Sequence, residues 1–199
     1  MIEFALRLPA AALAAAMLAV PAAAAPVAFV TTLSGANESP VNASPATGSV
    51  FVSFDIAAHL MRVVVDFDDL SGPNSAAHIH CCTTDPFALN QTASVATTTP
   101  TFPGFGLLLD GGHYDRTFDM TLASSYRAQF ITGNGGTTAS AEQALFNGML
   151  AGKAYFNIHS QQFPGGEIRG FLQVPEPASF TLALGALALM GAMRRKAQT

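Results

Sequence analysis

Hydrophobic and polar residues alternate along much of the chain between Ala28 and Gln173, which is the pattern of half-buried β-strands. In Ser49–Ile56 most apolar side chains fall on alternate positions, and Leu60–Phe67 repeats this arrangement. The three residues between these runs predict a hairpin. Further strands are predicted at Ala76–Cys82, Thr117–Leu122, Ala154–Ile158 and Glu167–Val174.

One segment departs from the alternation. Ser140 is followed three residues later by Gln143, a helix-capping signature, and the next residues carry one apolar helical stripe. They predict one short helix near 140–151. The segment Thr83–Phe105 has no periodicity and is expected to be a long surface loop. So many short strands favour an all-β fold in which two antiparallel sheets pack as a sandwich.

The N-terminus has the layout of a secretory signal peptide. Arg7 precedes the apolar run Leu8–Val20, and the small residues Ala22–Ala25 follow. The alternative is a buried N-terminal helix, but prolines bound the run and export accounts for the alanines without a core. We therefore expect signal peptidase to remove residues 1–25 during export across the inner membrane.

The C-terminus combines a short motif, the uncharged run Ala178–Met193 and a basic tip. As a helix this run rises about 24 Å, less than the roughly 30 Å hydrocarbon core of a bilayer, and the basic tip orients it toward the cytoplasm. A retained tail-anchored membrane protein is one interpretation. The motif and the tip are Pro175-Glu176-Pro177 and Arg194-Arg195-Lys196.

This order of parts, over residues 174–199, resembles the PEP-CTERM sorting signal of Gram-negative bacteria, whose tail is removed by an exosortase-type enzyme. The resemblance implies membrane contact through the tail before processing. It also implies a cell-surface or extracellular location afterwards, in a bacterium that makes exopolysaccharide.

Composition and charge make nucleic acid an unsuitable partner. Although 50% of the chain is hydrophobic and only 11% charged, the apolar excess lies at the two ends. Four of the nine basic residues lie there as well, which leaves five basic against twelve acidic residues in the stretch between Pro26 and Pro177. Binding to a phosphate backbone requires clustered Lys and Arg, which this stretch lacks.

Three stretches of the chain form a recognisable set of motifs. They are Thr32–Glu38 with Ser44–Gly48, Leu70–Pro73 with Ala77–His80, and Tyr155–His159 with Phe163–Gly170. Together they resemble the CHRD domain, a module named after chordin, over residues 28–173. The resemblance implies a secreted β-sandwich of Greek-key type, similar to immunoglobulin and superoxide dismutase domains, without a defined reaction. The chain departs from the usual pattern at Cys81-Cys82 and in the Thr-rich loop that follows.

The histidines are the candidate chemistry. In an extended strand His78, His80 and Cys82 point to one face. If His159 lies on a neighbouring strand, three imidazoles converge as a copper or zinc ligand set, with Cys82 or His113 as a further ligand. The alternative is half-buried packing, with hydrogen bonds from neighbouring polar residues.

A looser resemblance connects the three histidines to the copper ligands of Cu,Zn superoxide dismutase. No bridging histidine can be placed, so dismutase activity is not expected. His113 follows Gly111-Gly112, and an exposed turn is the simpler interpretation of its position.

Two further pairs of residues leave alternatives open. Adjacent cysteines on a strand point apart, so Cys81 and Cys82 are interpreted as buried thiols, a strained vicinal disulfide, a bridge between chains or, for Cys82, a metal ligand. Glu167 and Arg169 share a face and are expected to pair with each other or with a neighbouring strand.

A cluster of carboxylates lies at the end of the second predicted strand, at Asp66, Asp68 and Asp69. It fits a solvated turn better than a calcium site.

Two functions remain from the sequence. The first is a non-enzymatic envelope module that binds polysaccharide, an envelope protein or itself. The second is a small copper or zinc protein that uses His78, His80 and His159, either for binding alone or with a redox function.

Overall fold

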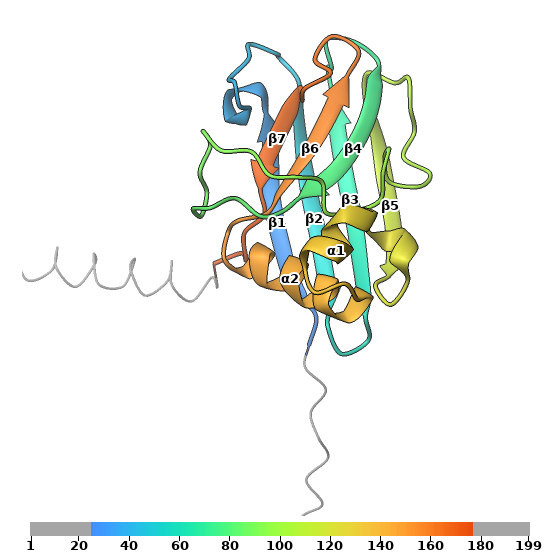
Figure 1. Ribbon diagram of the computed structural model, residues 1–199. Helices are drawn as coiled ribbons and strands as arrows, with labels where there is room; N and C mark the ends of the chain where they lie inside the picture. Colours follow the sequence, from blue (N-terminus) through green and yellow to red (C-terminus); the bar gives the residue numbers. More distant parts are fainter. Residues whose placement is uncertain (1–24, 177–199) are drawn as a thin grey trace, which may run out of the picture.

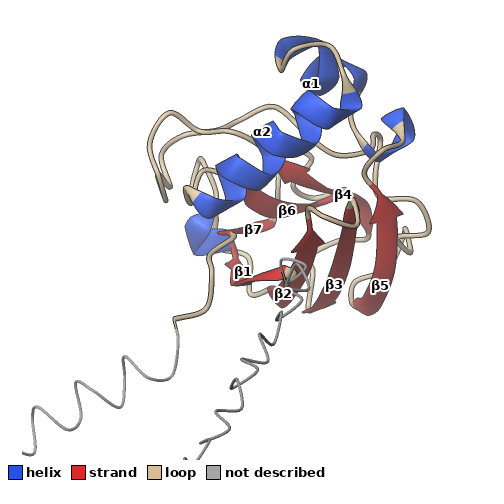
Figure 2. Ribbon diagram, turned by 90° about the horizontal axis from the view of Figure 1, so that it is seen from below, coloured by secondary structure: helices blue, strands red, loops and turns tan. Residues whose placement is uncertain are grey.

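The computed structural model describes residues 25–176, which form one antiparallel sheet with a few helices on it (Figure 1). The strand order across the sheet is β4-β6-β7-β1-β2-β3-β5. Figure 2 shows that the sheet is curled and that α1 and α2 lie over one of its sides. The elements are β1 (Val27–Ser34), β2 (Thr47–Asp55), β3 (Leu60–Asp68), β4 (Asn74–His80), β5 (Gly112–Asp119), α1 (Ala128–Gly133), α2 (Thr138–Leu150), β6 (Tyr155–Ser160) and β7 (Ile168–Phe171), with single 3-10 turns at Gly35–Asn37 and Ala123–Ser125.

The prediction of a mostly β domain is confirmed, but the described residues form one curled sheet and not the expected pair of separate sheets. The reason lies at the junction of β1 and β7. β1 pairs with β2 along eight residues, whereas it meets β7 at Ser34 opposite Arg169, with one more bridge from Val30 to Gln173. This narrow junction joins β4, β6 and β7 to β1, β2, β3 and β5. The hydrophobic pattern of the sequence is the same whether these two groups of strands are joined in one sheet or form two sheets.

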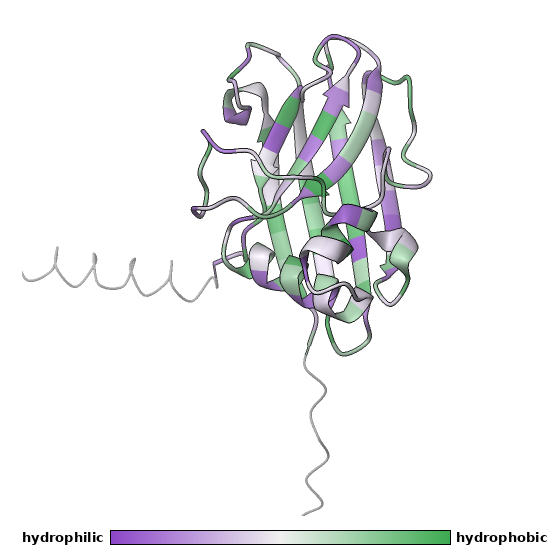
Figure 3. Ribbon diagram, viewed as in Figure 1, coloured by the Kyte–Doolittle hydropathy of each residue, from purple (hydrophilic) through white to green (hydrophobic). Residues whose placement is uncertain are grey.

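The predicted alternation places the core correctly. In β3 every second residue from Met61 to Phe67 is buried, and β2 buries Val50, Val52 and Phe54 on the same side. Hydrophobic and hydrophilic bands are visible along the strands in Figure 3. The buried aromatic and aliphatic side chains form a single cluster that includes residues of α2.

Helix α2 closes this core, as the sequence predicted, but it begins earlier than expected. Thr137 is the N-cap, because its hydroxyl accepts a bond from the Ser140 amide at 3.1 Å while the Ser140 hydroxyl accepts one from the Thr137 amide at 3.2 Å. Ser140 is therefore the third residue of the helix and not its cap. The sequence pattern missed the short helix α1, whose buried residue is Phe130.

Strand boundaries also shift. The strand expected at Thr117–Leu122 is observed at Gly112–Asp119, so His113 lies on a strand and not in a turn. The long segment after β4 is a loop, as predicted, and it runs along the edge of β4 through bonds such as Ala96 N–H to Ile79 C=O at 2.9 Å. The carbonyls of Ala93 and Pro100 in this loop bond to the rings of His80 and His78, so the loop also covers the face of the sheet that carries the histidines.

Within residues 25–176 no helix is long and apolar enough to cross a membrane. The predicted signal peptide, the apolar run Ala178–Met193 and the basic tip lie outside the described residues, as does Pro177.

Candidate metal centre

The pairing of β4 with β6 brings three histidines together. The two strands are antiparallel, with Ala76 opposite His159 and His80 opposite Tyr155. His78, His80 and His159 each offer one ring nitrogen, and these atoms lie within 4.8 Å of one another. The ring centroids are 5.2 to 6.1 Å apart. The convergence expected from the sequence is therefore present.

Each ring has one nitrogen bonded to a backbone carbonyl from a loop. His80 Nδ1 lies 2.8 Å from the carbonyl oxygen of Ala93, His159 Nδ1 lies 2.9 Å from that of Pro164, and His78 Nε2 bonds the carbonyl of Pro100. A carbonyl only accepts, so these nitrogens carry the protons. The tautomer of each neutral ring is thereby fixed.

The other nitrogen of each ring is left with its lone pair. His78 Nδ1, His80 Nε2 and His159 Nε2 are buried and have no hydrogen-bond partner within the described part of the chain. Three unpartnered acceptors in one buried place are unusual, because buried polar atoms are normally bonded. In a metal-ligating histidine the ring typically donates its second N–H to a carbonyl or carboxylate, as all three rings do here.

Burial keeps the rings neutral. It lowers the pKa of His78 and of His80 to about 4, although the bond from each ring to a carbonyl acts in the opposite direction. Burial also lowers the pKa of His159. At neutral pH all three rings are therefore uncharged, with one N–H and one free lone pair each, which is the form that binds a metal.

The separations are larger than a bound metal would require. Three nitrogens that each lie about 2.0–2.1 Å from one ion in a trigonal plane are about 3.6 Å apart. The observed limit of 4.8 Å exceeds this by about 1.2 Å, so the rings must move inward to hold an ion. The fold brings the three nitrogens together, and binding would complete their approach.

A buried network supports the cluster from one side. The ring of Tyr155 stacks on that of His80, with centroids 4.8 Å apart and an interplanar angle of 6°. The guanidinium carbon of Arg169 lies 4.7 Å from the Tyr155 centroid, and Arg169 Nε lies 3.8 Å from a carboxylate oxygen of Glu38. Arg169 therefore pairs with Glu38 on the loop after β1, and not with Glu167 or a neighbouring strand, the two alternatives expected from the sequence.

The other candidate ligands lie elsewhere. Cys81 and Cys82 form a vicinal disulfide, so Cys82 carries no free thiolate. His113 on β5 contacts Asp66, with His113 Nδ1 2.7 Å from a carboxylate oxygen, and it is absent from the cluster of ligand atoms. Glu167 accepts bonds from the Ser44 hydroxyl and the Ser71 amide, both at 2.6 Å.

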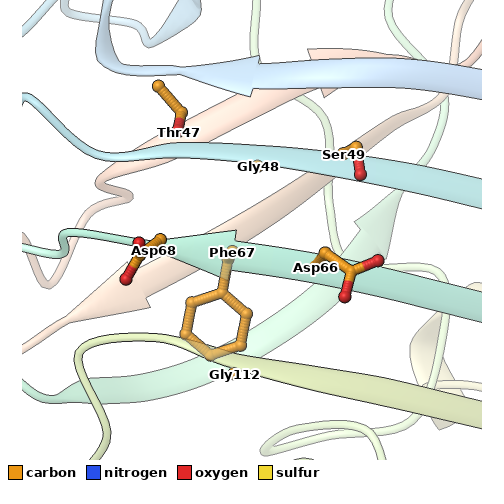
Figure 4. Close-up of a pocket in the computed structure, with 7 residues that line it drawn as sticks. All are labelled: Thr47, Gly48, Ser49, Asp66, Phe67, Asp68 and Gly112. Carbon is orange, nitrogen blue, oxygen red and sulfur yellow. The ribbon is translucent and has the colours of Figure 1, made fainter.

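Asp66 and Asp68 line a shallow hollow of about 580 Å³ over β2, β3 and β5, drawn in Figure 4. Their carboxylates are spread along β3, and the histidines contribute nothing to this hollow. Asp66 contacts the His113 ring, and no other carboxylate of this group in the described residues does so.

The sequence identified the three histidines but not the groups that bond to their rings. The acceptors are backbone carbonyls of Ala93, Pro100 and Pro164, and backbone atoms carry no residue-type signal. Arg169 was singled out, but with the wrong partner. The sequence also shows the glycine-rich turn that precedes Arg169. Only the fold shows that the carbonyl of Pro164 in this turn bonds to His159.

The fold and the cluster define a class: a mostly β domain with a buried set of three histidines on neighbouring strands. The family model of the CHRD domain matches residues 29–172, and the chain belongs to this family. The PEP-CTERM protein-sorting motif matches residues 173–196, which marks the chain for export, cell-surface sorting and processing by an exosortase-type enzyme. Searches of curated proteins and of solved structures gave no match.

Proposed function

We propose that this exported surface protein binds one copper or zinc ion through His78, His80 and His159. The observation that carries the proposal is the set of three buried ring nitrogens without partners, each on a ring whose other nitrogen donates to a backbone carbonyl. Imidazole nitrogens suit both metals. The proposed function is binding and not a reaction.

The competing function is a matrix module that contacts polysaccharide or an envelope protein without a metal. It accounts for export and surface sorting equally well. A matrix module without a metal does not explain why three acceptor nitrogens converge, however. Apolar side chains, or polar side chains with hydrogen-bond partners, would pack in the same place at a lower free-energy cost. The two functions differ in what happens when a histidine is replaced.

The test uses the exported protein, purified without chelator, exposed to Cu²⁺ with ascorbate or to Zn²⁺ and then desalted. Elemental analysis should find about one metal ion per chain in the wild type and none in His80→Ala. The matched control is His113→Ala, which removes an exposed histidine of β5 and should keep the metal. A wild type that retains neither metal in stoichiometric amount would reject the proposal in favour of the matrix module.

A further inference from the structure

The three proposed ligands bring no negative charge to the ion. Within residues 25–176 the cluster of ligand atoms contains only His78, His80 and His159, without a carboxylate or a thiolate. Neutral imidazoles leave the full charge of a bound ion uncompensated. An uncompensated charge in a buried site is costly, and the cost rises steeply with the charge of the ion.

A cation lies beside the cluster. The guanidinium carbon of Arg169 lies 4.7 Å from the centroid of the Tyr155 ring, which stacks on the ring of His80. Arg169 is only 1% exposed, and its guanidinium donates to the backbone carbonyls of Asn37, Leu89 and Gln91. These bonds fix a positive charge against the Tyr155 ring that stacks on His80.

The coordination number points the same way. Zinc takes four ligands in structural sites, and in catalytic sites it takes three ligands and a water. The unpartnered nitrogens of the three rings are shielded from solvent, and the described residues supply no fourth ligand to the cluster. A monovalent ion that accepts three nitrogens fits this site better than a divalent one.

From these observations we infer that the site prefers cuprous copper to zinc and cupric ions, and that Arg169 sets this preference as a positioning residue. The inference rests on the proposed function. The Arg169 charge repels a divalent ion by one unit more than a monovalent ion. At the distance of one intervening ring this difference corresponds to roughly tenfold in relative affinity.

The first measurement compares the metals in the wild type. Cu⁺, held reduced with ascorbate so that the Cys81–Cys82 disulfide stays intact, is titrated against bicinchoninate, and Zn²⁺ against a chromophoric chelator. We expect Cu⁺ to bind more tightly than Zn²⁺, and protein loaded with Cu²⁺ to lose its paramagnetic signal on addition of ascorbate while the copper stays bound. Binding of Zn²⁺ or Cu²⁺ as tight as that of Cu⁺ would overturn the inference and leave the proposed function standing.

Charge variants then test Arg169. Arg169→Gln should shift the ratio of Cu⁺ to Zn²⁺ affinity toward zinc by roughly tenfold, and Arg169→Lys should restore the ratio. Glu38→Gln, measured at pH 8, removes the negative charge beside Arg169 and should shift the affinity ratio toward Cu⁺. This variant tests the role of the Arg169 charge even if Arg169→Gln does not fold. An unchanged ratio in the folded variants would remove Arg169 from this role. Binding of no metal at all by the wild type would instead reject the proposed function itself.

Discussion

Gly148 of α2 lies against the Sγ atom of Cys81, with no room between them for a side chain. Cys81 directly follows His80 at the end of β4, and its disulfide partner Cys82 touches the same glycine. The contact therefore ties α2 to the strand that carries two of the three histidines.

Gly148→Ala should destabilise the fold, because its Cβ would overlap both sulfur atoms. Overpacking of this kind typically costs about 1–3 kcal/mol of unfolding free energy, which chemical denaturation measures. Gly133→Ala is the matched control, since a Cβ added there at the end of α1 meets nothing within 4 Å. Its stability should stay within about 1 kcal/mol of the wild type. Equal stability of the two variants would show that the disulfide and α2 move apart freely.

Glu38 should give the fold a pH dependence of its own. Burial raises the pKa of this carboxyl from its ordinary value of 4.5 to about 7, against the smaller lowering by the Arg169 charge. The folded state then holds the proton more tightly than the unfolded state. The stabilising contribution is full below about pH 4.5 and is lost as the pH rises through 7, by roughly 3 kcal/mol in total.

Glu38→Gln should remove this dependence, so the difference in unfolding free energy between variant and wild type should change between pH 5 and pH 8. Urea denaturation across that range measures it. Asp69→Asn, a change at an exposed carboxylate, is the control and should follow the wild-type curve. A constant difference between Glu38→Gln and wild type would contradict the raised pKa.

The disulfide should be dispensable for metal binding. The sulfur atoms of Cys81 and Cys82 are bonded to each other, and the cluster of ligand atoms consists of histidines. A Cys81→Ser, Cys82→Ser double variant that folds should hold as much copper as the wild type by elemental analysis. Loss of copper from the folded double variant, with circular dichroism unchanged, would make a cysteine thiolate one of the ligands.

The sorting motif should be required for removal of the C-terminal tail, and the mass of the mature protein should report this removal. Replacing Pro175, Glu176 and Pro177 with alanine removes the sequence that the PEP-CTERM match contains at its start. Surface material of the wild type should lack Arg194–Lys196 in mass spectrometry, while the triple variant should retain this basic tip. An intact tip on wild-type surface protein would contradict processing by an exosortase-type enzyme.

The sequence by itself determined what depends on local pattern. Alternation in β2 and β3 identified their buried faces, because side chains on a strand alternate by geometry. The spacing of His78 and His80 placed both rings on one face for the same reason. The order of motif, apolar run and basic tip identified the sorting signal without any fold.

Only the tertiary structure decided what depends on pairing between distant segments. The narrow junction of Ser34 with Arg169 makes one curled sheet where two were expected, and no local pattern records it. The register of β4 on β6 brings His159 to the other two rings, and the loop carbonyls of Ala93 and Pro100 fix which nitrogens stay free. Every residue has a backbone carbonyl, so the sequence does not indicate which carbonyls bond to the histidine rings. Only the fold determines these partners and therefore the geometry of the candidate metal centre.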